Sequence, residues 1–232
     1  SQARVLINTR GAADLLGATK MDRPEDIETN PRNGKVYCVM TKNEKRGTPA
    51  NPGVDAANPR PENRFGHIIE LTEDEHDAAA TTFTWEIFML CGNPASPPPG
   101  GVYFAGYDPS LVSPIANPDN ITFDRDGNMW IATDGQGDAA TLASNDGVFA
   151  VPLEGEERGF VRQFLSVPSG AEATGPELTP DDTTLFCAVQ HPGKGKSSYW
   201  PDSRWPDGDP ATPRPSVVAV VRSDHGCRTI GS

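Results

Sequence analysis

The chain reads Pro118-Asp119-Asn120-Ile121-Thr122-Phe123 and, after a polar turn, Gly127-Asn128-Met129-Trp130-Ile131-Ala132-Thr133-Asp134. The pattern is a proline, an acid, a short apolar stretch, a turn, and an apolar strand with an aromatic residue near its start. Such a pair of short apolar runs around a turn is typical of a β-hairpin. Two further stretches repeat the pattern: Arg23-Pro24-Glu25-Asp26-Ile27-Glu28 before Gly34-Lys35-Val36-Tyr37-Cys38-Val39-Met40, and Gly175-Pro176-Glu177-Leu178 before Thr184-Leu185-Phe186-Cys187-Ala188-Val189.

Repeats of this kind are typical of β-propellers, whose blades recur about every 40–50 residues. The composition agrees, because the 232 residues include 23 Gly and 23 Pro. Many short strands joined by turns tolerate that number of breakers, whereas a helix-rich domain does not. We therefore predict an all-β fold, a β-propeller with about three four-stranded blades.

Turn and loop composition divides the chain further. We expect residues 1–22 to be an N-terminal segment from a preceding blade, with one helical turn, and residues 93–116 to be a loop. Blades are expected at 23–92, with a long polar insertion, at 117–168, and at 169–232, where the last blade is incomplete. Three blades leave two sheet edges open, so we expect the chain to be a piece of a longer propeller.

The net charge of −12, from 32 acidic and 20 basic residues, argues against nucleic acid as a partner. The excess of acids either binds cations or simply keeps the protein soluble. No apolar stretch is long enough for a transmembrane helix, and no basic-then-apolar leader opens the chain, so an export signal is expected outside it. Neither a serine-hydrolase elbow nor a glycine-rich phosphate loop is present.

Four cysteines occur without the spacing of a zinc site: Cys38, Cys91, Cys187 and Cys227. Cys38 and Cys187 lie in the second strands of their repeats, where we expect small buried core residues. Cys91 and Cys227 each end a strand beside a glycine, which allows one disulfide. Four cysteines permit three full pairings, and the sequence does not choose among them.

The acids that open the repeats are the main candidates for a functional site. In a propeller the innermost strand of each blade begins near the central channel, so Glu25, Asp119 and Glu177 would converge there, with Glu28 and Asn120 close by. Converging carboxylates repel one another unless a cation neutralises them. Their oxygen atoms suit Ca²⁺ and also accept iron or manganese. The alternative is that a proline followed by an acid is only turn chemistry at a strand entrance.

Other polar residues carry weaker signals. Arg23 and Arg60 each precede a Pro-Glu pair, and a guanidinium there either grips a phosphate with two parallel hydrogen bonds or pairs with the nearby acid. Arg23 has the stronger claim because its motif opens an inner strand. His191 either faces the channel or is a polar loop residue. The run 124–128 fits a hairpin turn better than a calcium-binding EF-hand loop.

A longer set of motifs makes the chain recognisable: Arg23-Pro24-Glu25-Asp26, Asn58-Pro59-Arg60-Pro61-Glu62-Asn63-Arg64-Phe65-Gly66-His67-Ile68-Ile69-Glu70, Asn117-Pro118-Asp119-Asn120, Trp130-Ile131-Ala132-Thr133-Asp134-Gly135, Thr174-Gly175-Pro176-Glu177 and Val189-Gln190-His191-Pro192-Gly193. Together they resemble the PhoX-type bacterial alkaline phosphatases over essentially residues 20–225. The resemblance implies a six-bladed propeller that binds Ca²⁺ and Fe³⁺ in its channel and hydrolyses phosphate monoesters.

By that resemblance Arg23 would contact the substrate phosphate, Glu25 would bridge metals and Asp119 would be a metal ligand, with Glu177 and Glu62 as further candidates. It also implies a periplasmic or secreted protein, exported by the twin-arginine route. Family members are longer, and their N-terminal half supplies further ligands that are absent here. We therefore expect the C-terminal half of the enzyme, inactive alone, completed by the missing N-terminal half or by a second copy joined through the open blade edges.

Two alternatives come from other functional classes. One is a non-catalytic propeller whose metals only staple the blades together and whose faces bind a partner. The other is a calcium-dependent propeller hydrolase that acts on lactones or phosphotriesters. Hydrolysis of a simple phosphate monoester, with and without chelator, separates the first interpretation from both.

Overall fold

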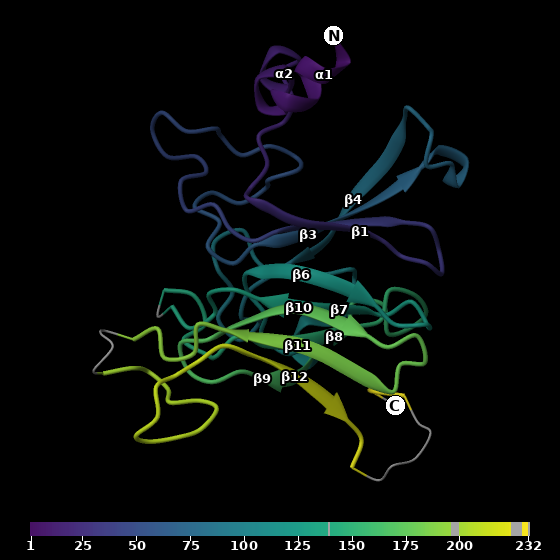
Figure 1. Cartoon of the computed structure of the whole chain (residues 1–232). Helices are drawn as coiled ribbons and strands as arrows, with labels where there is room; N and C mark the ends of the chain where they lie inside the picture. The colour runs from purple at the N-terminus through teal and green to yellow at the C-terminus, as the bar shows by residue number, and fades with distance from the viewer. Residues whose placement is uncertain (139, 196–199, 224–228, 232) are drawn as a thin grey trace.

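A computed structural model of the chain describes residues 1–138, 140–195, 200–223 and 229–231, and in them the fold is mostly β (Figure 1). The strands form three separate antiparallel sheets, each a meander in which consecutive strands are neighbours. The first sheet contains β1 (Pro24–Thr29), β2 (Val36–Met40), β3 (His67–Glu73), β4 (Phe83–Leu90) and β5 (Tyr103–Phe104). The second contains β6 (Pro118–Phe123), β7 (Met129–Thr133), β8 (Gly147–Val151) and β9 (Arg162–Ser166), and the third contains β10 (Glu172–Leu178), β11 (Thr184–Gln190) and β12 (Ser216–Val221).

The all-β prediction is confirmed, and the sheet boundaries follow the repeats. One difference is β5, which pairs Tyr103 with Leu90 and Phe104 with Met89 inside the stretch 93–116 that was expected to be a loop. Phe104 is fully buried in the core. A two-residue strand between proline-rich and glycine-rich turns carries too short an apolar pattern to predict.

The three sheets lie in order, with β6 between β1 and β10 (Figure 1). The hairpin turns of successive sheets also touch: Asn30 Nδ2 donates to Gly127 O at 2.9 Å, and Arg125 N donates to Asp182 Oδ2 at 3.0 Å. The first hairpin turn of each sheet therefore contacts the first hairpin turn of the next sheet, as expected for a structural repeat. The run 124–128 forms such a hairpin turn, with Gly127 N donating to Asp124 O at 3.0 Å.

Apolar side chains fill both gaps between the sheets. The first core layer, between the first and second sheets, includes Tyr37, Val39, Ile68, Phe88, Met89, Phe104, Ile115, Ile121, Met129, Ile131, Phe149 and Val151. The second core layer, between the second and third sheets, includes Trp130, Ala132, Val148, Val167, Ala171, Ala173, Leu178, Leu185, Cys187 and Val189. Strand β7 contributes to both layers, because alternate side chains of a strand point to opposite faces.

The outer parts of the chain add short helices and a long insertion. Residues 1–22 hold two helices, α1 (Gln2–Ile7) and α2 (Thr9–Leu15), rather than one helical turn, and neither has a buried residue. Two 3₁₀ turns, η1 (Asp74–His76) and η2 (Pro109–Leu111), lie in loops. The insertion after β2 is anchored by Arg46, whose Nε lies 2.8 Å from Asp22 Oδ1 with both side chains buried. Within the described residues, no helix has the length and apolarity to cross a membrane.

The cysteines with described positions are not in disulfides. Cys38, Cys91 and Cys187 are free. Cys187 is buried as expected, whereas Cys38 is only half-buried. Burial raises the pKa of the Cys91 thiol to about 12, so this sulfur stays protonated. Cys227, the other candidate for a disulfide, lies outside the described residues.

Candidate functional site

The first strands of the sheets begin with the same irregularity. In β1, Pro24 pairs with Met40 and Ile27 pairs with Cys38, so two residues of β1 face one residue of β2. In β6, Pro118 pairs with Thr133 and Ile121 pairs with Ile131, which leaves the same two-residue β-bulge. Glu25 and Asp119 are the first residues of their bulges, and Asp26 and Asn120 are the second. Bulges re-aim side chains and are common beside functional sites.

The second bulge residues join neighbouring sheets. Asp26 Oδ2 accepts a hydrogen bond from Ile121 N at 3.0 Å, and Asn120 Oδ1 accepts one from Gly175 N at 2.9 Å. Asn120 Oδ1 also accepts from the Thr174 hydroxyl at 2.7 Å. The side chain of Asn120 is therefore engaged in a structural contact between the second and third sheets.

The register of the third sheet places Glu177 differently from the sequence pattern. Thr174 pairs with Ala188 and Glu177 pairs with Phe186, so Gly175 is the first residue of this bulge and matches Asp119. Glu177 is exposed and lies two residues further along β10. The pKa of Glu28 is raised by burial, then by the charge of Asp26, and least by the charge of Glu177. Glu28 and Glu177 are thus close to each other, and neither is among the charged residues that shift the pKa of Asp119.

Three carboxyl groups, one from each sheet, lie near Asp119. Its side chain is buried, and burial together with the charges of Glu25, Asp134 and Glu172 raises its pKa to about 7, while Arg23 opposes the shift. The hydroxyl of Thr41 lies 3.5 Å from Asp119 Oδ1. Burial and like charges both disfavour ionisation of a carboxyl, and Arg23 offsets only part of their effect on Asp119.

Arg23 connects the first sheet with the second. Its Nε lies 2.6 Å from Glu25 Oε1, and its Nη2 lies 3.6 Å from Asp134 Oδ2, a residue that directly follows β7. The backbone of Arg23 has a φ of 51°, a left-handed conformation that is unusual for a non-glycine residue. Such positions cluster at functional sites, where the surroundings hold them in place. The half-exposed guanidinium retains free donors toward solvent.

The third sheet contributes Glu172 and His191. Glu172 Oε2 accepts from Gln190 Nε2 at 2.6 Å and lies 3.0 Å from His191 Nε2. Glu172 is itself buried, at the start of β10. His191 therefore lies beside a buried acid and lines the cleft described next, and its facing a propeller channel stays a prediction.

Arg23, Asp134 and His191 also line a cleft of about 430 Å³, together with Lys42, Gly135, Asp146 and Lys194 among others. Its floor is the loop after β7, which Asp146 holds by accepting from the Thr133 hydroxyl at 2.9 Å and from Gln136 N at 3.0 Å. Burial raises the pKa of Asp146. The cleft therefore combines cationic side chains with carboxylates, which suits an anionic ligand bound beside a cation.

Two predicted candidates lie away from this cleft. Arg60 is buried and donates to the backbone carbonyl of Cys91 at 2.6 Å, so it holds loops rather than a ligand. Glu62 is exposed on the same insertion and, among the described residues, is not part of the cleft lining. The metal-ligand prediction for Glu62 stays a prediction.

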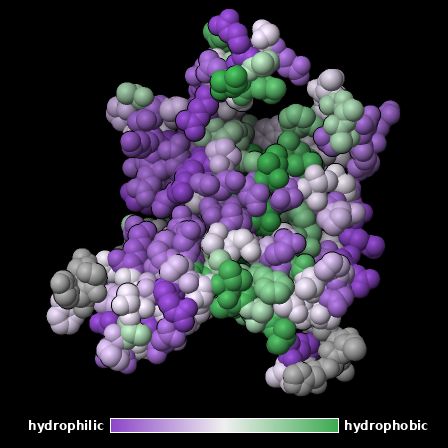
Figure 2. Space-filling model, viewed as in Figure 1, coloured by the Kyte–Doolittle hydropathy of each residue, from purple (hydrophilic) through white to green (hydrophobic). Residues whose placement is uncertain are grey.

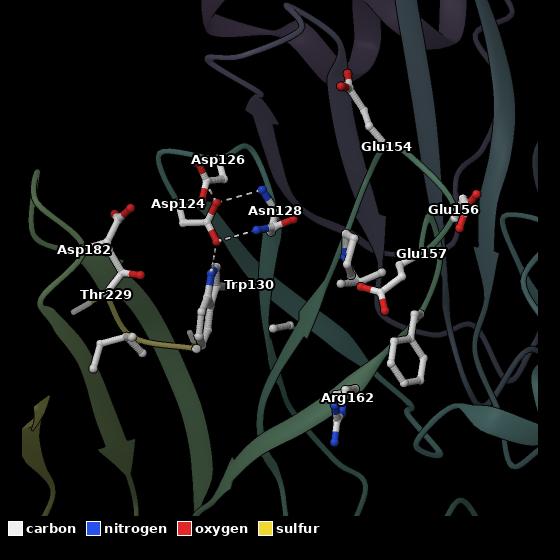
Figure 3. A pocket seen from close by; sticks show the side chains of 16 residues that line it. Asp124, Asp126, Asn128, Trp130, Glu154, Glu156, Glu157, Arg162, Asp182 and Thr229 are labelled. Atoms are coloured by element: carbon white, nitrogen blue, oxygen red, sulfur yellow. Dashed lines mark hydrogen bonds between the residues drawn. The ribbon is translucent and has the colours of Figure 1, made fainter. Parts of the chain in front are cut away.

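A larger cavity, of about 500 Å³, lies between the outer strands of the second sheet and the hairpin of the third (Figure 3). Three of its acids, Asp124, Glu154 and Asp182, accept hydrogen bonds from other residues. Asp124 Oδ2 accepts from Asn128 Nδ2 at 2.9 Å and from Trp130 Nε1 at 3.1 Å (Figure 3). Asp124 thus shapes the hairpin and satisfies a buried indole.

The sequence pattern missed Asp134, Glu172, Asp146 and Lys42. Asp134 is the last residue of the stretch 127–134. The strand pairings place Thr41 and Val189 at the same position in the other two sheets, so the repeat gives no reason to select Asp134. Glu172 precedes its bulge, outside the repeated motif. The pairing of β6 with β7 brings Asp134 to Asp119, and the packing of the third sheet against the second brings Glu172 there.

Comparison with known proteins gives two findings. A sequence model of the family described as "Alkaline phosphatase PhoX" matches residues 1–193. A solved structure, "Pseudomonas fluorescens PhoX in complex with vanadate, a transition state analogue", matches with 37% sequence identity and a TM-score of 0.83. The match covers 100% of this chain and 38% of that one, so the chain spans well under half the length of this relative. No curated protein matched the chain.

Proposed function

The chain belongs to the PhoX alkaline phosphatase family, and on that premise we propose that it supplies part of the active site of a metal-dependent phosphomonoesterase. The observation that carries the proposal is the cleft in which Arg23 lies between Glu25 and Asp134, beside a buried Asp119 whose pKa is raised to about 7. A guanidinium next to an acid cluster suits a dianionic phosphate held against cations.

We propose that the three sheets are consecutive blades of a larger, six-bladed propeller. Supporting this, β1, β6 and β10 lie side by side, and each begins at the cleft with the same bulge. The outer faces also carry apolar side chains that a further blade would cover: Ile27 on β1 is 61% exposed, and Val217 and Val221 on β12 are 71% and 57% exposed. Figure 2 shows the apolar surface over β11 and β12. We propose the remaining half of the parent protein, or a second copy of this chain, as the partner of these faces.

The residues present fit part of a metal site. Carboxylate oxygens are the ligands that Ca²⁺ prefers, and they also accept Fe³⁺. The pKa of Asp119 is raised because the carboxyl is buried and other acids lie near it, and a bound cation would stabilise its ionised form. Within the described part of the chain, however, no three acids, histidines or cysteines are close enough to hold a metal ion by themselves. We propose that Glu25 and Asp119 are ligands and that the parent protein supplies the others.

Each side chain then has a role in hydrolysis. A bound metal would neutralise charge on the phosphoryl oxygens. Glu25 orients Arg23, whose outward N–H groups grip those oxygens as a fork, and Asp134 steadies the guanidinium from the second sheet. Glu172 holds the His191 ring at the rim. The product phosphate leaves to the periplasm or the medium, where we propose that the parent protein works.

The test is hydrolysis of p-nitrophenyl phosphate by the full-length protein with and without chelator. We expect turnover that is lost with chelator and restored by Ca²⁺ and Fe³⁺, and no turnover by residues 1–232 alone. Full activity of the isolated chain would contradict the divided site. Hydrolysis of lactones or phosphotriesters but not of monoesters would refute the phosphomonoesterase, and no hydrolysis at all would indicate a metal-stapled binding module.

A further inference from the structure

Lys42 is a cation of the cleft without an ion-pair partner among the described residues. It follows Thr41 directly, and Thr41 N donates to Arg23 O at 3.1 Å, so the backbones of Lys42 and Arg23 are linked. Both side chains line the cleft. Arg23 is engaged by Glu25 and Asp134, whereas no acid of the described chain lies within ion-pair distance of the Lys42 ammonium.

The ammonium of Lys42 lies over Gly135. A Cβ at that position would stand 3.3 Å from Lys42 Nζ, tighter than ordinary van der Waals contact. Gly135 has a φ of 119°, which side chains rarely adopt. The glycine thus both allows the turn after β7 and leaves room for the head of the lysine.

A buried acceptor lies at the same place. Asn117 Oδ1 lies 3.5 Å from the same point above Gly135, and it has no hydrogen-bond partner although Asn117 is fully buried. The amide orientation is fixed, because Nδ2 donates to Thr41 O at 3.3 Å and to Arg64 O at 3.0 Å. Flipping the amide would lose both bonds, so the carbonyl oxygen must face this space. A buried acceptor left unsatisfied is costly.

We propose that Lys42 is a second anion-binding residue of the cleft and that Asn117 positions it. In the structure the ammonium is not hydrogen-bonded to Asn117 Oδ1. When the anion binds, one N–H turns to Asn117 Oδ1 and the other two donate to an oxygen of the substrate's phosphoryl group. The arrangement explains together the unpartnered acceptor, the unpaired cation and the bare glycine between them. This proposal rests on the proposed function and adds the ammonium of Lys42 to the guanidinium of Arg23 as a group that binds the phosphate.

The experiment uses the full-length protein and four variants. Lys42→Met and Lys42→Gln remove the charge, Lys42→Arg keeps it, and Lys45→Met removes an exposed lysine of the same insertion as a matched control. Inorganic phosphate is titrated calorimetrically, p-nitrophenyl phosphate kinetics are measured, and melting temperatures verify folding. We expect Lys42→Met and Lys42→Gln to weaken phosphate binding about tenfold and to raise KM similarly, the effect of one lost charge-assisted hydrogen bond. Lys42→Arg should lose less than either, and Lys45→Met should match wild type.

The outcomes separate this proposal from the proposed function. If folded Lys42→Gln or Lys42→Met binds phosphate as tightly as wild type, the role of Lys42 is refuted, whatever the activity. If the wild type binds phosphate through Lys42 but hydrolyses no monoester, the anion site stands and the enzymatic function falls. If the wild type binds no phosphate but hydrolyses the monoester, the role of Lys42 as an anion-binding residue is refuted and the enzymatic function stands.

Discussion

Arg23 and Asp134 come from different sheets, and Arg23 Nη2 lies 3.6 Å from Asp134 Oδ2. The contact crosses from the start of β1 to the end of β7, and both residues line the cleft. At the same time Arg23 Nε lies 2.6 Å from Glu25. The guanidinium is thus held from two sides, and its direction depends on how the first two sheets pack together.

Replacing Arg23 with Lys should reduce phosphatase activity of the full-length enzyme without harming its fold. Lysine keeps the charge but cannot donate two parallel hydrogen bonds. We expect kcat/KM for p-nitrophenyl phosphate to fall about a hundredfold, with a melting temperature within about 2 °C of wild type. Arg32→Lys, on the exposed hairpin between β1 and β2, is the control. A large loss of stability with unchanged kinetics would instead show that Arg23 serves the scaffold.

The raised pKa of Asp119 makes stability depend on pH when metal is absent. A carboxyl whose pKa rises on folding, here from 3.8 to about 7, favours the folded state below about pH 4, and this contribution is lost as the pH rises through 7. Between pH 4 and pH 8 the free energy of unfolding of the wild type should therefore fall by about 1–3 kcal/mol more than that of Asp119→Asn.

Chemical denaturation across this pH range in chelator tests the prediction, with the exposed Asp126→Asn as control. Added Ca²⁺ should restore the wild type at pH 8 but not Asp119→Asn, because the cation replaces the proton. Parallel pH curves for the wild type and Asp119→Asn would mean that Asp119 ionises normally.

Asp146→Ala should destabilise the loop that forms the floor of the cleft. The substitution removes the acceptor of the Thr133 hydroxyl and of the Gln136 amide, both of them buried. We expect a loss of about 2–3 kcal/mol in the free energy of unfolding. Asp138→Ala, exposed in the same loop, should cost far less. Equal effects of the two substitutions would show that water replaces Asp146 without penalty.

The exposed valines of β12 should drive self-association of the isolated chain. We expect residues 1–232 to form dimers or larger species at micromolar concentration, and Val217→Lys with Val221→Lys to return them to monomers. Light scattering measures the change. Lysines at Leu15 and Leu16, which are 90% and 87% exposed at the end of α2, are the control. If those substitutions abolish association equally, the sheet face is not the interface.

The sequence predicted much of this fold because hairpins leave local marks. The local sequence pattern was enough to predict the strand at Pro118–Phe123 and the matching strand that begins at Pro24. Glu177 was misaligned because a proline served as the reference point, whereas the bulge in β10 is fixed by the pairing of Thr174 with Ala188. Asp134 reaches Asp119 through the pairing of β6 with β7, but its place in the motif has no acidic counterpart in the other repeats. Glu172 reaches Asp119 only through the packing of the third sheet against the second, which no local pattern records.

Strand β7 has a consequence for how the chain comes apart. Met129 and Ile131 belong to the first core layer, and Trp130 and Ala132 belong to the second. Unfolding of β7 would remove packing contacts from both core layers, so we expect that the three sheets do not unfold one by one. Unfolding should be a single cooperative event, with the slowest hydrogen exchange at the amides of β7.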